Sequence, residues 1–313
     1  MHRGVMPHDW GMAVGLAVLA LWIPSPLYLV ALACFGLPHV IWEMMWIRKV
    51  SANRLPRHWW VMLFAILAIQ ASGRALAASE SLGAKAAVMT DLLTLALAVA
   101  MVVVLSGGGW RAGLARLAAV LGAVALASVG VLAPPETMVM VLITFSVAHN
   151  FTPLGLERLT AKPDETWSSL RWIMILPLVL LFLPALPQPD FLKSMQSWPP
   201  MEFLWLRGED ALTGLNLFPA LVLAQCLHYL AVLRILPRRL DGGWGPGRWR
   251  NLAVIAGGLA TMGFIWSFPD ARRFYGVAAG VHAWVEWPIL LCLLGGIMQS
   301  GRTVGPIGAE GRV

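Results

Sequence analysis

The sequence is poor in charge. Only 12% of its 313 residues are Asp, Glu, Lys or Arg, while 58% are hydrophobic. Soluble globular domains carry about twice that share of charged residues, because charge keeps a protein surface hydrated. The composition therefore excludes an ordinary soluble protein and predicts an integral membrane protein. The net charge of +7 does not indicate a nucleic-acid partner, since the basic residues lie in short segments between apolar runs and form no basic face.

The sequence also lacks the signatures of several common classes of site. Its three cysteines, Cys34, Cys226 and Cys292, lie inside apolar runs without Cys-x-x-Cys spacing, which argues against a disulfide framework and a cysteine metal site. Nucleotide-binding glycine loops, the serine hydrolase elbow and the clustered histidine boxes of membrane desaturases are all missing. Any chemistry must therefore come from residues dispersed along the chain.

Long apolar runs fill the chain instead. A membrane-spanning helix needs about 20 apolar residues, and its backbone must be hydrogen-bonded internally. The runs predict an all-α, polytopic transmembrane helix bundle in a single domain, 1–313, with about ten helices, or nine if the short first helix is only half-inserted. The predicted helices cover residues 10–23, 27–47, 58–78, 86–106, 117–133, 137–156, 172–188, 211–233, 251–268 and 274–298.

The distribution of Lys and Arg predicts the orientation of this bundle. With ten helices, 17 of the 23 basic residues fall on the side that holds both termini, and an excess of this kind is typical of cytoplasmic segments. We therefore expect a multi-pass protein of the inner (plasma) membrane with both termini in the cytoplasm. Residues 189–210, rich in aromatic and acidic side chains, are expected to form an outer interfacial loop, and residues 301–313 a cytoplasmic tail.

Four of the seven histidines lie well inside apolar runs, each in a different predicted helix: His39, His149, His228 and His282. Ionisable groups at membrane depth are costly and usually face the interior of a bundle. At about 1.5 Å per residue, their distances from the helix ends are compatible with a single layer. Imidazole is the commonest metal ligand in proteins, so the four histidines predict one metal site built from four helices.

Two glutamates are candidates for supporting this site. Glu43 follows His39 by one helical turn, and Glu286 follows His282 by one turn, so each pair shares a helix face. Metal-bound histidines usually donate their second ring N–H to a carboxylate or a carbonyl. We therefore expect Glu43 and Glu286 to orient the ligands, with a position at the membrane interface as the alternative for Glu43.

Further polar and aromatic residues adjoin the four histidines. Gln225 and Asn150 are candidates for hydrogen bonds into the same cavity, with ordinary interhelical hydrogen bonding as the alternative. Trp42, Tyr229 and Trp284 are candidates for lining a substrate pocket, and packing in the core is their alternative role. The sequence thus predicts a polar centre beside an aromatic wall.

The ligand set favours iron. Imidazole ligands suit iron, copper and zinc, so copper and zinc remain alternatives. Four histidines on non-haem Fe²⁺ leave open positions for dioxygen, whereas a closed tetrahedral zinc would be structural and has little evident purpose within lipid. We therefore predict an iron-dependent oxygenase whose partners are dioxygen, membrane lipids and a lipid-soluble small-molecule substrate.

The arrangement resembles the Brp/Blh family of bacterial membrane proteins, which includes β-carotene 15,15'-dioxygenases. The resemblance rests on Gly36-x-Pro38-His39 near the N-terminus, on one histidine in each of three later helices, and on the polytopic layout. It implies that the four histidines hold a non-haem iron and that the reaction is oxidative cleavage of a carotenoid-like polyene. The chain departs from the family pattern after the first histidine, where it has Val40, Ile41, Trp42 and Glu43.

Two functions of other classes also fit the sequence. A proton-coupled transporter could use the intramembrane histidines and glutamates as titrating sites, and the prolines within the apolar runs favour broken helices of the kind that transporters have. A haem-b electron carrier could use the same histidines as axial ligands. Against the transporter, proton coupling does not require four histidines at similar depth.

Overall fold

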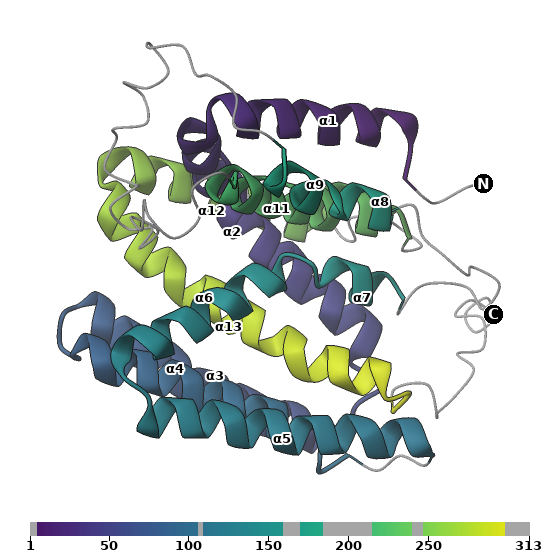
Figure 1. Ribbon diagram of the computed structural model, residues 1–313, viewed down its shortest axis with the longest axis vertical. Coiled ribbons are helices and arrows are strands. Elements are labelled where there is room, and N and C mark those ends of the chain that lie inside the picture. Colours follow the sequence, from purple (N-terminus) through teal and green to yellow (C-terminus); the bar gives the residue numbers. More distant parts are fainter. Residues whose placement is uncertain (1–4, 106–108, 159–169, 184–214, 240–246, 298–313) are drawn as a thin grey trace, which may run out of the picture.

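The computed structural model describes residues 5–105, 109–158, 170–183, 215–239 and 247–297, and this part of the chain is helical with no β-strand (Figure 1). The N-terminal part contains α1 (Pro7–Trp22), α2 (Pro24–Ser51), α3 (Arg57–Ala78), α4 (Ala84–Ala100), α5 (Trp110–Leu132), α6 (Pro135–His149) and α7 (Pro153–Glu157). The C-terminal part contains α8 (Leu170–Met174), α9 (Leu176–Leu181), α11 (Leu217–Leu230), the π-helix η2 (Ala231–Ile235), the 3₁₀ helix η3 (Leu236–Arg239), α12 (Gly247–Trp266) and α13 (Phe268–Leu294). The prediction of an all-α polytopic bundle is confirmed.

Six helical segments in the described ranges are long and apolar enough to cross a membrane: Pro24–Ser51, Arg57–Ala78, Trp110–Leu132, Pro135–Glu157, Leu217–Arg238 and Phe268–Leu294. The helices α1 and α4 have only 16 and 17 residues, less than the roughly 20 that the hydrocarbon layer requires. Every predicted helix has a counterpart, but within the described residues fewer than ten helices meet the requirements of a full span.

Prolines account for several helix boundaries. Pro7, Pro24, Pro135 and Pro153 are the first residues of α1, α2, α6 and α7. Proline suits this position because the N–H it lacks would have no partner within the helix. Pro177, in contrast, falls inside the predicted helix 172–188, and the structure has two short helices there, α8 and α9. The expected single helix was therefore wrong, because proline removes a backbone hydrogen bond and clashes with the preceding turn.

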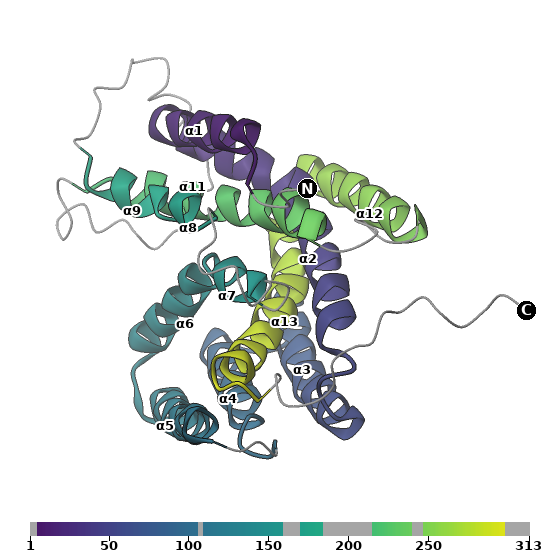
Figure 2. The same cartoon turned by 90° about the vertical axis from the view of Figure 1, so that its right-hand side faces the viewer.

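The long C-terminal helix α13 lies at the centre of the fold. In both views it runs between one group of helices, α1, α9 and α11, and a second group, α3, α4 and α5 (Figures 1 and 2). It contacts α2, α3, α4 and α12 along its length. In the most apolar stretch of each segment, 61% of α13 and 72% of Leu217–Arg238, which begins with α11, is buried. The corresponding share is 22% for α3 and for α5. The inner helices α11 and α13 are thus the ones placed to carry an interior site.

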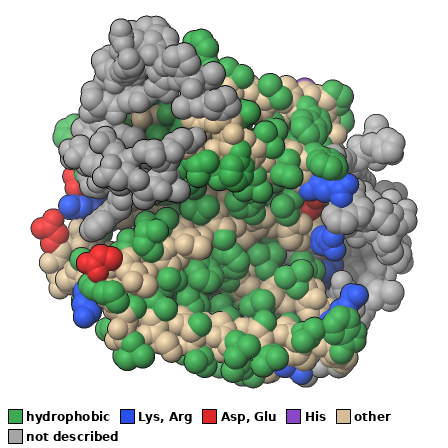
Figure 3. Space-filling view, in the orientation of Figure 1, with side chains coloured by type: hydrophobic (Ala, Val, Ile, Leu, Met, Phe, Trp, Pro, Cys, Tyr) green, Lys and Arg blue, Asp and Glu red, His purple; other side chains and the backbone are tan. Residues whose placement is uncertain are grey.

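The outer surface is apolar. Figure 3 shows a face dominated by hydrophobic side chains, with Lys, Arg, Asp and Glu gathered at its two edges. Ile265 and Trp266 are 81% and 93% exposed. Apolar surface of this extent is unusual for a soluble monomer and suits contact with lipid. The beginning of α1 and the end of α13 lie on the same side of the molecule (Figure 1). Their cytoplasmic placement stays a prediction, and segments 189–210 and 301–313 lie outside the described residues.

A close contact between helices positions the first histidine. The helix α2 continues through Pro38, and α12 packs directly against that proline. A Cβ atom at Gly257 of α12 would lie 2.6 Å from Cγ of Pro38, so only glycine fits without a shift. Thr261, one turn later, donates a hydrogen bond to the carbonyl of Ala33 (2.9 Å). Glycine and threonine together hold α12 against the turn of α2 that precedes His39.

Candidate metal centre

Four helices bring the four histidines together. His39 comes from α2, His149 from the last residue of α6, His228 from α11 and His282 from α13. Each is no more than 7% exposed. One ligand atom from each histidine and one from Glu43 all lie within 4.8 Å of one another. Donor atoms bound to one ion at about 2.1 Å lie about 3 to 4 Å apart, so a small inward movement would allow them to share an ion.

Two of the histidines face each other directly. Nε2 of His39 lies 3.2 Å from Nε2 of His282. The other ring nitrogen of His39, Nδ1, lies 3.1 Å from the backbone carbonyl oxygen of Phe35, which can only accept a hydrogen bond. Nδ1 therefore carries the proton, and the lone pair of Nε2 points into the cluster. Metal-binding histidines are commonly oriented in this way.

The two glutamates contact histidines of neighbouring helices. Oε2 of Glu43 lies 3.3 Å from Nε2 of His228 and 3.7 Å from Nε2 of His282. Oε2 of Glu286 lies 3.0 Å from Nδ1 of His149. The expected pairing of each glutamate with the histidine one turn earlier is therefore replaced by pairing across helix interfaces. Spacing along one helix determines which residues share a face, but the packing of helices determines which groups meet.

Many polar atoms of this cluster lack hydrogen bonds within the described structure. They include both ring nitrogens of His149 and His228 and both carboxylate oxygens of Glu43 and Glu286. Buried polar groups nearly always have a partner, because an unpaired one retains the cost of its desolvation. A cation bound among the ring nitrogens would satisfy lone pairs that the protein leaves open. The site therefore could hold a metal ion, and the residues fit one in number, type and spacing.

Local irregularities of the helices lie beside two of the four histidines. Pro153 opens α7 directly after the turn that follows His149, and the hydroxyl of Thr152 donates to the carbonyl of His149 (2.7 Å). The π-helix η2 begins three residues after His228. Single π turns within α-helices are frequent at functional sites. The α-helical backbone is therefore interrupted close to both His149 and His228.

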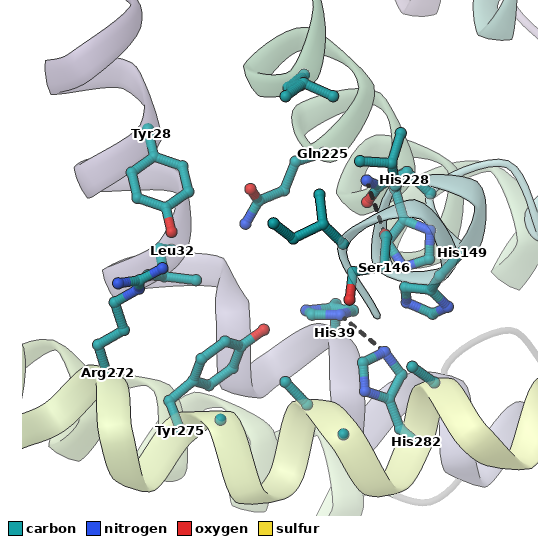
Figure 4. A pocket seen from close by; sticks show the side chains of 18 of the residues that line it. Tyr28, Leu32, His39, Ser146, His149, Gln225, His228, Arg272, Tyr275 and His282 are labelled. Atoms are coloured by element: carbon teal, nitrogen blue, oxygen red, sulfur yellow. Dashed lines mark hydrogen bonds between the residues drawn. The ribbon is translucent and has the colours of Figure 1, made fainter. Parts of the chain in front are cut away.

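A cavity of about 600 Å³ adjoins the cluster. All four histidines line it, whereas Glu43 and Glu286 do not, so the carboxylates contact the rings from outside the cavity. Figure 4 shows His39, His149, His228 and His282 gathered at one end, with Tyr28 and Arg272 at the other. The volume is within the range of pockets that hold drug-sized ligands, about 300–1,000 Å³. The histidine cluster therefore borders a space large enough for a small molecule.

Gln225, Asn150 and Tyr229, which were also predicted to belong to the site, all line the cavity and have further contacts. Gln225 lines the cavity but donates to the hydroxyl of Tyr229 (2.6 Å). Asn150 lines it and donates to the carbonyl of Ser146 (3.4 Å). The ring of Tyr229 packs on that of His39, with centroids 4.3 Å apart. Tyr229 therefore packs against His39 as well as lining the cavity.

The two tryptophans that were predicted to line the pocket, Trp42 and Trp284, differ in position. Trp284 lines the cavity, and its ring N–H donates to the backbone carbonyl of Asp91 (3.1 Å). Trp42 is 3% exposed in the hydrophobic core and is not among the residues that line the cavity. Its alternative role in core packing is therefore the one that the structure has.

Sequence reasoning missed several residues of this cavity. All three tyrosines of the chain, Tyr28, Tyr229 and Tyr275, line it, as do Arg74 and Arg272. Only Tyr229 adjoins a histidine in the sequence, so the other residues carried no local signal. The one signal in the sequence was that tyrosine is rare beside tryptophan and phenylalanine, so its few positions could have been considered as candidate site residues.

Comparisons with known proteins do not assign the chain to a family. No protein-family model, no curated protein and no solved structure matches it.

Proposed function

We propose that this protein is a membrane-embedded metalloenzyme with a four-histidine non-haem iron site, and that it oxidises or cleaves an apolar, polyene or lipid-like substrate with dioxygen. The observation that carries the proposal is the buried cluster of four histidines and Glu43, whose ligand atoms lie within 4.8 Å of one another at one end of a cavity of about 600 Å³. A structural metal would not need such a space. The resemblance to the Brp/Blh family points the same way and is part of the proposal.

Different residues of the site would have different roles. His39, His149, His228 and His282 would hold the iron, which supplies the binding and activation of dioxygen. Glu43 and Glu286 lie against three of these rings and would hold them in orientation. The apolar walls of the cavity would bind the chain of the substrate and exclude water. A lipid-soluble substrate would enter from the surrounding bilayer.

A haem centre is disfavoured by the geometry of the cluster. The ring centroids of His39, His228 and His149 are 4.6–5.2 Å from those of neighbouring histidines, and several of these pairs meet edge to face. A porphyrin between two axial histidines would require these rings to move apart. A single ion fits the existing arrangement with little movement.

An oxygen-uptake assay tests this function. Detergent-purified protein loaded with Fe²⁺ would be mixed with a carotenoid, and both the loss of visible absorption and the consumption of dioxygen would be followed. We expect the two signals to fall together for the wild type and to be absent in His149→Ala. His58→Ala is the control, because His58 is exposed at the start of α3. Absence of uptake with carotenoids and other polyenes by iron-loaded protein would contradict the proposal.

A further inference from the structure

The two glutamates of the histidine cluster contact different sides of the histidine rings. Oε2 of Glu286 lies 3.0 Å from Nδ1 of His149, which leaves Nε2 of that ring for an ion. Oε2 of Glu43 instead lies 3.3 Å from Nε2 of His228 and 3.7 Å from Nε2 of His282. A carboxylate that orients a metal-bound histidine contacts the ring nitrogen that does not bind the metal. Glu286 has that position, whereas Glu43 meets two Nε2 atoms.

The contacts of His39 show that Nε2 of His282 faces the centre of the cluster. The two rings point towards each other, with their Nε2 atoms 3.2 Å apart (Figure 4). Nδ1 of His39 donates to the carbonyl oxygen of Phe35 (3.1 Å), so the lone pair of its Nε2 is available to an ion. The contact of Glu43 with Nε2 of His282 therefore places a carboxylate oxygen beside the point where an ion would bind.

The separations between these atoms match those of donors that share one ion. Atoms bound at about 2.1 Å to a common ion lie about 3 to 4 Å apart. The three distances among the Nε2 atoms and the carboxylate oxygen of Glu43 are 3.2, 3.3 and 3.7 Å. We propose that Glu43 is itself a metal ligand, the fifth beside the four histidines. It would hold the rings of His228 and His282 in orientation through the ion that it shares with them.

The charge of the cluster favours a divalent ion in this site. Glu43 and Glu286 are 1% and 0% exposed, and within the described residues their ion pairs are with histidines. Two ionised carboxylates inside an apolar bundle need a compensating positive charge. A divalent cation balances both, whereas Cu⁺ would leave a net negative charge. A carboxylate ligand among histidines is also typical of non-haem Fe²⁺ sites.

The position of Glu43 indicates which side of the ion stays open. All four histidines line the cavity and Glu43 does not, so the carboxylate would bind the ion from the side away from the cavity. An octahedral ion with five protein ligands keeps one position, and this position would face the cavity. Here the inference rests on the proposed function: one position is enough for dioxygen, and the substrate would bind beside the ion without a metal-chelating group.

Cobalt substitution tests the ligand assignment without an activity assay. Co²⁺ bound to chelator-treated, detergent-purified protein has visible bands whose position and intensity depend on its ligands. We expect Glu43→Gln to change these bands and to lower the affinity for Co²⁺ by more than about 100-fold, beyond the 10–100-fold typical of losing an orienting group. Glu286→Gln is the matched control, and it should weaken binding less and keep the wild-type bands. Wild-type bands in Glu43→Gln would overturn the inference.

Infrared difference spectra provide a second test that does not need a variant of Glu43. Subtracting the spectrum of the metal-free protein from that of the Zn²⁺-bound protein isolates the groups that the metal changes, and coordination shifts the stretching bands of a carboxylate. We expect such a shift in the wild type and also in Glu286→Gln, which lacks the other carboxylate. Its absence from the wild type, or its loss in Glu286→Gln, would overturn the inference even if Glu43→Gln failed to fold.

The same samples distinguish failure of the ligand assignment from failure of the proposed function. A wild-type protein that binds Co²⁺ or Zn²⁺ stoichiometrically but lacks the carboxylate signal would retain the metal centre and lose only Glu43 as a ligand. A wild-type protein that binds neither ion would overturn the inference together with the proposed function.

Discussion

Two polar clusters lie inside this apolar bundle, and they differ in how far their groups are paired. In the first, the carboxylate of Asp91 in α4 accepts from Arg74 (2.8 Å) and from Gln70 (3.3 Å), both in α3. Its backbone carbonyl accepts from Trp284. In the second, the histidine cluster, most ring nitrogens and carboxylate oxygens lack a hydrogen bond.

The difference separates a structural role from a binding role. A buried charge inside a membrane protein needs a partner, and the Asp91 cluster supplies one from the protein itself. The histidine cluster leaves most of its ring nitrogens and carboxylate oxygens without a hydrogen bond, which is costly unless a ligand occupies the centre. The ion pair between Asp91 and Arg74 therefore indicates a structural role, whereas the gathering of four histidines with so many unpaired atoms indicates a binding site.

The largest effect on stability is expected from Asp91→Ala. The substitution leaves the guanidinium group of Arg74 inside the bundle without its carboxylate, which costs about 3 kcal/mol of unfolding free energy, the lower end of values for broken buried pairs. Denaturation of the detergent-solubilised protein by SDS would measure it, with and without chelator, and the loss should be the same in both. The control is Asp270→Ala, whose side chain is 63% exposed, with a change of less than about 1 kcal/mol. Equal stability of the two variants would contradict the structural role.

Glu286→Gln should weaken metal binding with little effect on folding. The carboxylate lies 3.0 Å from Nδ1 of His149, and loss of such a supporting group costs about 10–100-fold in metal affinity. Competition with a metal-sensitive dye would measure the affinity. Glu80→Gln provides the comparison, because that side chain is 76% exposed and distant from the cluster in the sequence. An unchanged affinity in Glu286→Gln would mean that the carboxylate does not orient His149.

Packing of α12 on α2 is expected to matter at one glycine and not at the next. Gly257→Ala would place Cβ 2.6 Å from Pro38 and should cost about 1–3 kcal/mol through overpacking. Gly258→Ala has nothing within 4 Å of its new Cβ and should gain about 0.5–1 kcal/mol, the usual advantage of alanine in a helix. Thermal unfolding of both variants tests the pair. Similar behaviour of the two would contradict the close contact beside His39.

The smallest effect is expected at Asp9, at the start of α1 and outside the six candidate spans. Burial alone would raise the pKa of its carboxyl group, but hydrogen bonds from Arg238, Met6 and Arg234 lower it from 3.8 to about 2. Because the folded pKa lies below the unfolded one, the carboxylate stabilises the fold above pH 4, and this contribution is lost as the pH falls towards 2.

The advantage of wild type over Asp9→Asn should therefore be about 1 kcal/mol at pH 6, since the arginine partners are partly exposed. It should shrink between pH 4 and pH 3 in detergent unfolding measurements. A difference that stays constant over that range would contradict the proposed ion pair.

Much of the fold was predictable because apolar runs of fixed length report directly on membrane helices. The gathering of His39, His149, His228 and His282 followed from depth, since residues at one level of a bundle can meet. The partners of Glu43 and Glu286 could not be predicted, because helix rotation and crossing decide contacts between helices. Asp91 illustrates the same limit: it is 7% exposed and paired with Arg74 of the neighbouring helix, a contact that no spacing within one helix indicates.

The cavity was beyond sequence reasoning for a related physical reason. Tyr28 lies in α2, whereas Tyr275 and Arg272 lie in α13, and none of the three is adjacent to a histidine in the sequence, so no short motif marks them as cavity residues. A cavity is space left over by packing, and it depends on small residues such as Gly36 as much as on the residues that line it. Only the three-dimensional arrangement shows which residues face that space.

Metal content, measured together with an optical spectrum on the detergent-purified protein, tests the central claim most directly. The account predicts about one iron per chain in the wild type, without the Soret band of a haem, and a loss of at least tenfold in His149→Ala plus His228→Ala. His8→Ala plus His58→Ala, at two exposed positions, should keep the metal. A wild-type protein without stoichiometric transition metal, or a double variant of the cluster that retains it, would contradict the account.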